Sequence, residues 1–366
     1  MDENASIERI VDVVVIGAGQ AGLSAAYHLR RRGFLPVDRG SEAPTFVVLD
    51  ANRAPGGAWQ HRWESLRMGT VNGIHELPGF EVPAADPAAP SREVLPLYFA
   101  EYERRYDLAV RRPVTVRAVR RRGNSEGLRV ETDDGDWVAG HVINATGTWS
   151  RPFWPHYPGR ERFRGRQLHT ADYVSAEEFA GKNVIIVGAG VSAIQLLDEI
   201  SHVAETTWMT RREPDWLEED FDIPARIAAL AGVEERVRRG LPPGSVISVT
   251  GMHWTPWARA AEARGVLERH PMFAAIEPDG VRMPDGSFLP ADVILWATGF
   301  RPALDHLAPL GLRTAAGGIR VEGTVATDEP RLHLIGYGPS QSTIGANRAG
   351  RAAVAAILAE REAIAA

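Results

Sequence analysis

The sequence of 366 residues contains no cysteine, which excludes structural disulfides, thiolate metal sites and any Cys-x-x-Cys redox pair. Its 11 histidines show none of the spacings of metal sites, so we expect no metal. Long apolar runs are also lacking, since none approaches the ~20 residues that a membrane-spanning helix needs. The first residues, Met1-Asp2-Glu3-Asn4, are acidic and polar, unlike those of a signal peptide. We therefore expect a cytoplasmic protein with no membrane partner.

An excess of basic residues is missing too. Lys182 is the only lysine, and the net charge is −6, so the overall balance gives no indication of nucleic-acid binding. The run Arg120-Arg121-Arg122 is interpreted as the solvated tip of a hairpin. The length allows two domains with sizeable cores, and the hydrophobic fraction of 44% is typical of a globular protein.

The stretch around which the chain is organised lies near its N-terminus. Residues 13–16 are apolar and β-branched, which predicts a strand buried on both faces. A helical pattern follows, and between the two lie glycines at the G-x-G-x-x-G spacing: Gly17, Gly19 and Gly22. The first glycine allows a sharp turn, the second lets a pyrophosphate approach the backbone, and the third lets the helix pack closely on the strand. The helix N-terminus offers free N–H groups and a positive dipole end to phosphates.

A second predicted strand, residues 45–49, ends in Asp50, where a carboxylate that accepts hydrogen bonds from ribose hydroxyls belongs. Asp50 lies 33 residues after Gly17, more than the usual ~20, and we assign the excess to a surface loop around residues 36–44. Asp38 is the rival acid, but it lies within that loop. The strand before the glycines and the helix after them favour a dinucleotide site over a glycine turn in an ordinary α/β protein.

The same device recurs later in the chain. Residues 183–187 form another apolar strand, and the turn and helix start that follow are Gly188, Gly190, Val191, Ser192 and Ala193, with alanine in place of the third glycine. The next strand ends in Thr210, and Arg211 and Arg212 follow it, 23 residues after the first glycine of the turn. Guanidinium groups match a 2′-phosphate in a bidentate fork, so this unit suits NADPH better than NADH. The alternative is an exposed arginine pair at a strand end.

The rest of the chain gives broader signals. A helix is predicted for residues 92–106, and residues 213–270 are expected to be largely helical. Trp216, Trp254 and Trp257 lie in that second region, as core residues or as the lining of a pocket. Strands are predicted at residues 114–119, 128–132, 142–144, 292–296 and 331–335, and a helix of small residues at about 343–362.

These motifs resemble the flavin-dependent monooxygenases with two dinucleotide-binding domains: flavin-containing monooxygenases, plant auxin-forming relatives and Baeyer–Villiger enzymes. The resemblance covers nearly the whole chain, in matching order. Its most specific piece is Phe163-x-Gly165-x-x-x-His169-x-x-x-Tyr173, which matches the family's F-x-G-x-x-x-H-x-x-x-aromatic signature ahead of the second glycine turn. Baeyer–Villiger members usually finish the signature with Trp-Pro, so Tyr173-Val174 is closer to the flavin-containing monooxygenase form.

The resemblance implies FAD in the first unit and NADPH in the second. Asn72 falls near the family's flavin-facing asparagine and His169 would help to seat NADP+, so these two are the expected catalytic residues. The acid often found beside Gly336 in the family is missing here. The expected cofactor-binding residues are Gly17, Gly19, Gln20, Ala21, Gly22, Asp50, Ala51, Gly57, Trp59, Val116, Thr146, Gly147, Gly188, Gly190, Val191, Ser192, Ala193, Thr210, Arg211, Arg212, Ala297, Thr298, Gly299, Gly336, Gln341 and Ser342.

The expected fold is therefore α/β, with two Rossmann-like dinucleotide-binding domains and the NADPH domain inserted in the FAD domain. We expect the FAD domain to comprise residues 1–170 and 291–366. The NADPH domain is expected at residues 171–290, with a helical insertion at about 213–270. The two Ala-Thr-Gly strand ends, at 145–147 and 297–299, match the family's crossings between the domains.

The expected function is NADPH-dependent oxygenation of a small organic substrate, by N- or S-oxygenation or Baeyer–Villiger insertion, through a C4a-(hydro)peroxyflavin. The cofactor supplies this chemistry, which agrees with the lack of hydrolase, zinc-protease and P-loop motifs. The expected partners are the substrate and O2, with a homodimer as an open option. Two alternatives remain: a flavoprotein reductase that passes electrons to a carrier, and a redox sensor or binding protein without turnover.

Overall fold

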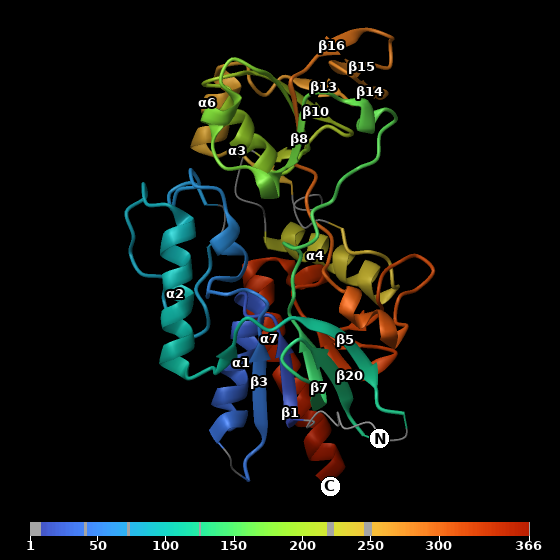
Figure 1. The fold of residues 1–366 in the computed structure, drawn as a ribbon. Helices are drawn as coiled ribbons and strands as arrows, with labels where there is room; N and C mark the ends of the chain where they lie inside the picture. Colours follow the sequence, from blue (N-terminus) through green and yellow to red (C-terminus); the bar gives the residue numbers. More distant parts are fainter. Residues whose placement is uncertain are drawn as a thin grey trace.

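The chain folds into two lobes, each built around a sheet whose central strands are parallel (Figure 1). The computed structural model describes residues 9–39, 42–71, 74–123, 126–217, 223–244 and 251–365. The first lobe holds both ends of the described chain, and the second lobe is inserted between them. The predicted α/β class with two Rossmann-like units is confirmed.

Five parallel strands form the centre of the first sheet. Val13 and Val15 point into one hydrophobic core, and Val14 and Ile16 into the other, so the strand before the first glycine turn is buried on both faces as predicted. The central order is β20 (Glu329–Leu334), β7 (Trp137–Asn144), β1 (Arg9–Ile16), β3 (Thr45–Leu49) and β2 (Leu35–Pro36). The edges add β4 (Val110–Arg111), β5 (Val116–Arg121), β6 (Leu128–Thr132), β18 (Val321–Glu322) and β19 (Val325–Ala326).

Three helices share one core on one face of this sheet: α1 (Gln20–Arg31), α2 (Ser91–Tyr106) and α7 (Thr343–Ala365). α1 and α7 approach so closely that a Cβ at Gly350 would lie 2.6 Å from Oγ of Ser24. The opposite core includes residues of β5, β6 and the short helix η6 (Asp305–Leu310). Other short 3-10 helices are η1 (Val37–Arg39), η2 (Gly57–His61), η3 (Arg160–Arg162), η4 (Thr170–Asp172), η5 (Ala176–Phe179) and η7 (Gly338–Gln341).

The second sheet is entirely parallel. Its order is β13 (Arg269–Pro271), β10 (Glu205–Thr210), β9 (Asn183–Val187), β17 (Val293–Trp296) and β8 (Arg166–His169). Helices α3 (Val191–Ile200) and α6 (Pro256–Ala263) contribute to the core on one face. The three-stranded antiparallel sheet β14 (Ala275–Glu277), β15 (Gly280–Arg282) and β16 (Phe288–Pro290) contributes to the core on the other face.

Two segments connect the lobes, and both begin with Ala-Thr-Gly. Residues 145–165 lead from β7 to the second sheet, and residues 297–303 return from β17. The segments pair in antiparallel fashion at Pro152 and Phe300. Because β7 and β17 both end here, the carboxyl edges of the two parallel sheets open toward the connection. Ligands of open α/β sheets bind at these edges.

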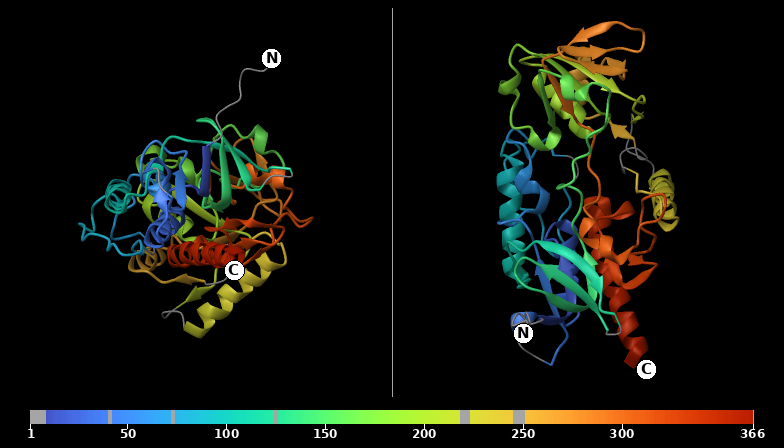
Figure 2. Two further views of the ribbon diagram at one scale, coloured as in Figure 1. Left: turned by 90° about the horizontal axis from the view of Figure 1, so that it is seen from below. Right: turned by 45° about the vertical axis from the view of Figure 1, so that its right-hand side comes forward.

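The expected boundaries of the second lobe need correction. The boundaries at residues 170 and 291 exclude β8 and β17, which hydrogen-bond into the second sheet, so this lobe extends outward on both sides. Beside its helices, the described part of 213–270 contains the short strands β11 (Trp216–Leu217), β12 (Met252–His253) and β13; the helical insertion stays a prediction. Its longest helix, α4 (Ile223–Arg238), packs against the first lobe, where Val237 is buried in the core beside η6 (Figure 2).

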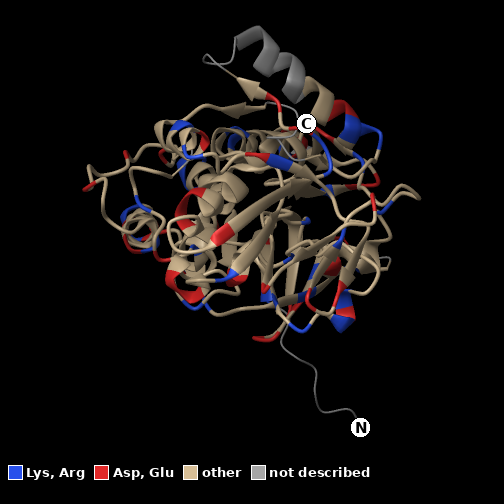
Figure 3. Ribbon diagram, turned by 90° about the horizontal axis from the view of Figure 1, so that it is seen from above, with Lys and Arg blue, Asp and Glu red and all other residues tan. Residues whose placement is uncertain are grey.

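Charged residues of both signs are interspersed over the molecule (Figure 3). At the predicted hairpin tip, Arg120 pairs with Glu131 and Arg121 with the buried Glu329, so these arginines are engaged within the protein. In the part of the chain that the structure describes, no helix is both long and apolar enough to cross a bilayer.

Candidate cofactor-binding site

The first glycine turn has the geometry of a phosphate cradle. Gly17 has φ +99° and donates its N–H to the carbonyl oxygen of Leu49 at 2.7 Å, which ties the turn to β3. A Cβ at Gly22 would lie 1.9 Å from the Gly17 carbonyl oxygen, so only glycine lets α1 pack here. At Gly19, by contrast, nothing lies within 4 Å of an added Cβ. The helix start has no side-chain cap, so its N–H groups remain available to a phosphate.

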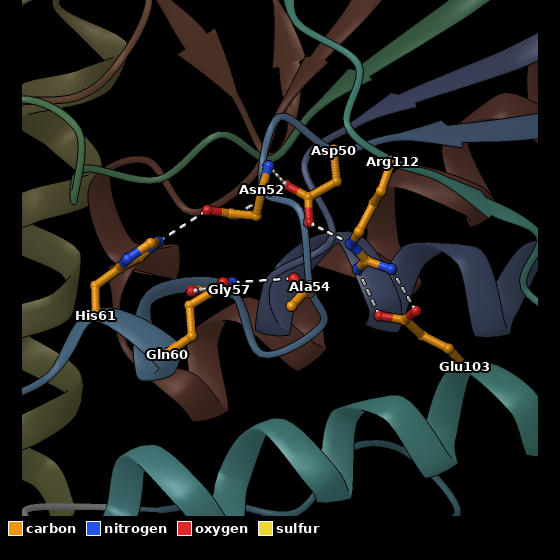
Figure 4. Close-up of polar contacts among 8 residues, drawn as sticks. All are labelled: Asp50, Asn52, Ala54, Gly57, Gln60, His61, Glu103 and Arg112. Carbon is orange, nitrogen blue, oxygen red and sulfur yellow. Dashed lines mark hydrogen bonds and ion pairs between the residues drawn. The ribbon is translucent and has the colours of Figure 1, made fainter.

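Asp50 occupies the predicted place at the end of β3 and is buried (Figure 4). Its carboxylate accepts from Nε of Arg112 at 2.9 Å and from Nδ2 of Asn52 at 3.1 Å. Arg112 also makes two bonds of 2.6 Å to Glu103 on α2. Burial lowers the pKa of Arg112, but the hydrogen bonds and charges of its two carboxylate partners outweigh burial and raise it overall. The Arg112 bridge therefore fixes the Asp50 carboxylate in place.

Asp38, the rival acid, lies in η1 and pairs with Arg111 at the surface. It is not at the end of a central strand. The geometry therefore supports the choice of Asp50 as the acid of the first unit.

The Gly-Gly-x-Trp loop lies directly against the first glycine turn. Gly56 and Gly57 both have positive φ, and a Cβ at Gly57 would lie 2.8 Å from Cα of Gly19. Trp59 is partly buried against the core shared by α1 and α7. The loop is thus placed to cover a ligand on the turn. Asn72, expected to face the flavin, lies outside the described residues.

The second glycine turn repeats this arrangement. Gly188 has φ +147°, and a Cβ there would lie 2.2 Å from the carbonyl oxygen of Ala297. Gly190 precedes α3 and has open space where a Cβ would be. Val191 and Ser192 begin the uncapped helix, and Ala193 is fully buried. This turn can also receive a phosphate.

Arg211 and Arg212 are exposed directly after β10. Thr210 is buried, and its hydroxyl donates to the carbonyl oxygen of Arg212 at 2.7 Å, which shapes the strand end. Among the described residues, neither guanidinium has a hydrogen-bonding or ionic partner. Both are therefore available to an anionic group at the carboxyl edge of the second sheet.

His169 is fully buried where β8 meets the returning connection. Its Nδ1 accepts from the N–H of Ala171 at 3.1 Å, and its Nε2 lies 3.0 Å from the carbonyl oxygen of Gly299. The ring therefore carries its proton on Nε2, and burial lowers its pKa. With both nitrogens engaged, the ring lacks a free nitrogen for proton transfer. In this geometry His169 positions the crossing at Gly299, and its role toward the cofactors stays a prediction.

The two crossings are held together by the small residues predicted there. Thr146 donates its hydroxyl to the carbonyl oxygen of Ala303 at 2.7 Å, and the Gly147 carbonyl oxygen accepts the N–H of the same residue at 2.9 Å. On the other crossing, the N–H of Ala297 bonds Val187, and Thr298 donates to Phe153. The expected residues of both crossings therefore lie together between the lobes.

The last expected group surrounds the start of α7. A Cβ on Gly336 would lie 3.8 Å from Cα of Gly147 and 3.9 Å from Cβ of Ala21, so three of the expected residues meet. Gln20 donates to Asn347 of α7 at 2.9 Å. Gln341 is partly buried at the end of η7, and Ser342 accepts the N–H of Gly345. Of the other two expected residues, Ala51 is exposed directly after Asp50, and Val116 is partly buried at the start of β5.

A contact that joins the lobes beside the crossings was not predicted from any motif. Ser65 of the first lobe and Tyr173 of the signature both donate to Oε1 of Glu199 on α3, at 2.5 and 2.8 Å. Burial, followed by the charge of Glu199, raises the pKa of Tyr173. In addition, Gln195 of α3 donates to the carbonyl oxygen of Thr70 at 2.8 Å. These contacts fix α3 against the first lobe.

Two facing glycine turns, one followed by an acid and the other by arginines, define a protein that binds two dinucleotides. The chain matches the family described as pyridine nucleotide-disulphide oxidoreductase over residues 14–336. It belongs to that family and, within it, to the class B flavin-dependent monooxygenases, whose cofactors are FAD and NADPH. The family's name refers to disulphide chemistry, for which this chain has no cysteine.

The structure is similar to that of a flavin-containing monooxygenase from Stenotrophomonas maltophilia, with 41% identity, 96% of this chain and 99% of that chain covered, and a TM-score of 0.79. A rice indole-3-pyruvate monooxygenase, YUCCA1, is 31% identical over 58% of this chain and 51% of its own length. A Baeyer–Villiger monooxygenase from Streptomyces coelicolor is 28% identical over 66% of this chain and 44% of its own length. The match thus spans about half the length of these two curated relatives or less.

Proposed function

We propose that this protein is an NADPH-dependent FAD monooxygenase that oxygenates a small organic substrate through a C4a-(hydro)peroxyflavin, by N- or S-oxygenation or Baeyer–Villiger insertion. The observation that carries the proposal is the pair of glycine cradles at carboxyl edges that open toward one connection. The resemblance to the Stenotrophomonas enzyme over nearly the full length of both chains supports it. Bound FAD, reduced by NADPH, supplies the reaction with O2.

In this proposal the first lobe holds FAD. The turn at Gly17 and Gly19 presents N–H groups of α1 to its diphosphate. The carboxylate of Asp50, oriented by Arg112, accepts hydrogen bonds from the ribose hydroxyls. The loop at Gly57 closes over the turn and excludes water from it.

The second lobe holds NADPH in this proposal. The N-terminus of α3 binds the diphosphate, and Arg211 and Arg212 bind the 2′-phosphate. His169 fixes the crossing at Gly299 through Nε2, and Glu199 holds α3 against the first lobe. The chain itself thus binds, orients and excludes water, without a proton-transfer residue of its own. A cytoplasmic location and a homodimer complete the proposal; fractionation and light scattering test them.

The test is anaerobic reduction of the purified yellow protein by NADPH, followed by mixing with O2 in a stopped-flow instrument. A persistent oxygenated flavin, with oxygenated product from a panel of amines, sulfides and ketones and little hydrogen peroxide, is the expected result. Rapid reoxidation without that species, together with electron transfer to a carrier, would instead identify a reductase. A protein that takes up no FAD would contradict the proposal altogether.

A further inference from the structure

A cavity of about 380 Å3 lies between the two lobes, next to the crossings. One side comes from the end of η2 and the residues after it, and the other from the signature segment after β8. Its lining is Gln60, His61, Arg62, Trp63, Arg92, Trp149, Ala171, Asp172, Tyr173 and Val174. Residues of both lobes therefore surround one space of the size of a small organic group.

Arg62 is the unusual member of this lining. Its guanidinium carbon lies 5.4 Å from the ring centre of Trp59 and 4.8 Å from that of Trp149, so the group is held between two indoles. Its Nε is buried and has no hydrogen-bond acceptor. Among the described residues, no carboxylate lies within ion-pairing distance of Arg62. Burial lowers the pKa of Arg62 to about 10, and the group stays charged at neutral pH.

The two indoles do not replace an anion. A cation over an aromatic face is stabilised by about 0.5–2 kcal/mol, but the ring gives no in-plane acceptor for the N–H groups. Removing a charge from water costs several kcal/mol unless it is paired. The other buried guanidinium beside this site, that of Arg112, has two carboxylates. Arg62 as a whole is only partly buried, but its Nε is buried without a hydrogen-bond partner and no carboxylate pairs with it among the described residues.

The other ionisable side chains and the amide of the lining already have partners. Arg92 pairs with Glu64 at 3.1 Å, and Gln60 donates to the carbonyl oxygens of Ala54 and Gly57. His61 lies 2.8 Å from Oδ1 of Asn52, and its pKa is lowered by burial. Asp172 accepts the N–H of His169 at 3.1 Å. Among the described residues, Arg62 is thus the charged side chain of the lining that makes neither a hydrogen bond nor an ion pair.

We propose that Arg62 binds an anionic group, phosphate or carboxylate, of a ligand seated in this cavity between the lobes. The inference rests on the proposed function, because a cofactor diphosphate and the carboxylate of an organic substrate are the two sources of such a group. Trp149, on the first crossing, stacks with His61 and Phe300 beside the Arg62 guanidinium. Since the lining comes from both lobes, a ligand held by Arg62 also bridges them.

The experiment compares Arg62→Gln and Arg62→Lys with the wild type and with Arg67→Gln, an exposed arginine of the same loop. Four affinities are measured: FAD by reconstitution of deflavinated protein, and NADP+, inorganic pyrophosphate and benzoate by quenching of tryptophan fluorescence. We expect Arg62→Gln to weaken at least one affinity by about 10- to 100-fold, the range for a charged hydrogen bond. The lysine variant should recover part of it, and Arg67→Gln should match the wild type.

The pattern of loss identifies the source of the anion. Loss of FAD, of NADP+ or of benzoate indicates the prosthetic group, the coenzyme or a carboxylate substrate, respectively. Unchanged affinities in Arg62→Gln, with only a lower Tm, would overturn the proposal. Arg62 would then serve only to stabilise the fold by stacking with Trp59 and Trp149. If that variant does not fold, labelling of Arg62 by phenylglyoxal in the wild type is measured by peptide mass spectrometry. The proposal requires pyrophosphate or benzoate to reduce this labelling. Equal labelling with and without these two ligands would also overturn the proposal. A wild type that binds pyrophosphate or benzoate but no dinucleotide refutes the proposed function alone.

Discussion

The two lobes use the same strand-turn-helix device with opposite finishing residues. In the first lobe the residue after β3 is Asp50, buried and held by Arg112. In the second lobe the residues after β10 are Arg211 and Arg212, exposed and without partners among the described residues. The third glycine of the first turn cannot carry a Cβ, whereas its counterpart in the second turn is Ala193.

This difference matches a division between a resident group and an exchangeable one. A buried acid whose position is fixed before binding pays no ordering cost when the ligand arrives, which favours tight retention. Exposed arginines lose side-chain freedom on binding and are screened by salt, which favours a ligand that leaves after each turnover. We interpret the first cradle as the site of the flavin and the second as that of the coenzyme.

The largest effect is expected from breaking the fixed acid. Arg112→Ala leaves Asp50 and Glu103 as buried carboxylates without a counter-ion, so we expect the free energy of unfolding to fall by about 3–5 kcal/mol and FAD to be lost. Urea unfolding and the flavin content measure this. Arg104→Ala removes an exposed pair with Glu101 on the same helix and should leave the Tm unchanged. Equal effects of the two substitutions would refute the role of the bridge.

The next test concerns the third glycine of the first turn, which is alanine in the second turn. Gly22→Ala places a Cβ 1.9 Å from a backbone oxygen, so α1 must move; we expect about 2–3 kcal/mol of destabilisation and weaker FAD retention. Ala193→Gly makes the opposite change in the second turn and should cost about 1 kcal/mol, from helix propensity. Calorimetry and flavin absorbance report both. A Gly22→Ala protein as stable and as yellow as the wild type would contradict the packing argument.

Removal of the arginine pair should act on the coenzyme alone. In the double variant Arg211→Ala, Arg212→Ala, we expect the KM for NADPH to rise by a factor equivalent to about 2 kcal/mol or more, because charge-assisted bonds to the 2′-phosphate are lost. The KM for NADH, which has no 2′-phosphate, should change little. Steady-state oxidation of both coenzymes measures the split. The flavin content serves as the control and should stay constant. A similar rise for NADH would show that the arginines do not read the phosphate.

The smallest expected effect concerns pH and the first cradle. Burial lowers the pKa of His306 to about 4, and its Nε2 lies 2.6 Å from Oδ1 of Asn144 at the end of β7. The unfolded chain takes up this proton near pH 6.5, so the contribution to stability is complete above that pH and is lost as the pH falls toward 4. Near pH 5.7 we expect a loss of about 1 kcal/mol that His306→Gln lacks. Urea unfolding across this range measures it, with the exposed His202→Gln as the control; parallel curves for all three proteins would exclude the effect.

Much of the fold followed from local patterns. The β-branched run at 13–16, the glycine spacing and the apolar helix face each specify their own structure, and the same logic found the second turn at Gly188. The boundaries at 170 and 291 failed because sheet membership is decided by hydrogen bonds to strands far along the chain. The short strand β13 could not be located for a similar reason, because it gains its order from pairing with β10.

The candidate site likewise contains some residues that could be placed from the sequence and others that only the structure identifies. Asp50 could be placed by its position after a strand, but Arg112 could not, since 62 residues separate the two partners. His169 matched a signature, yet only its burial and its contact with Gly299 assign it a positioning role. No sequence pattern pointed to a functional role of Arg62, because a charged group without a partner can be recognised only when its surroundings are known.

The sequence by itself determined that there are two dinucleotide cradles, of opposite polarity, because strand, turn and helix are specified by short-range periodicity and by the spacing of the glycines between them. The tertiary structure alone decided how the cradles face each other, which side chains fix the acid, and where a cavity forms between the lobes. Those features depend on contacts between residues far apart in the chain, whose energies come from burial and packing rather than from local backbone preference.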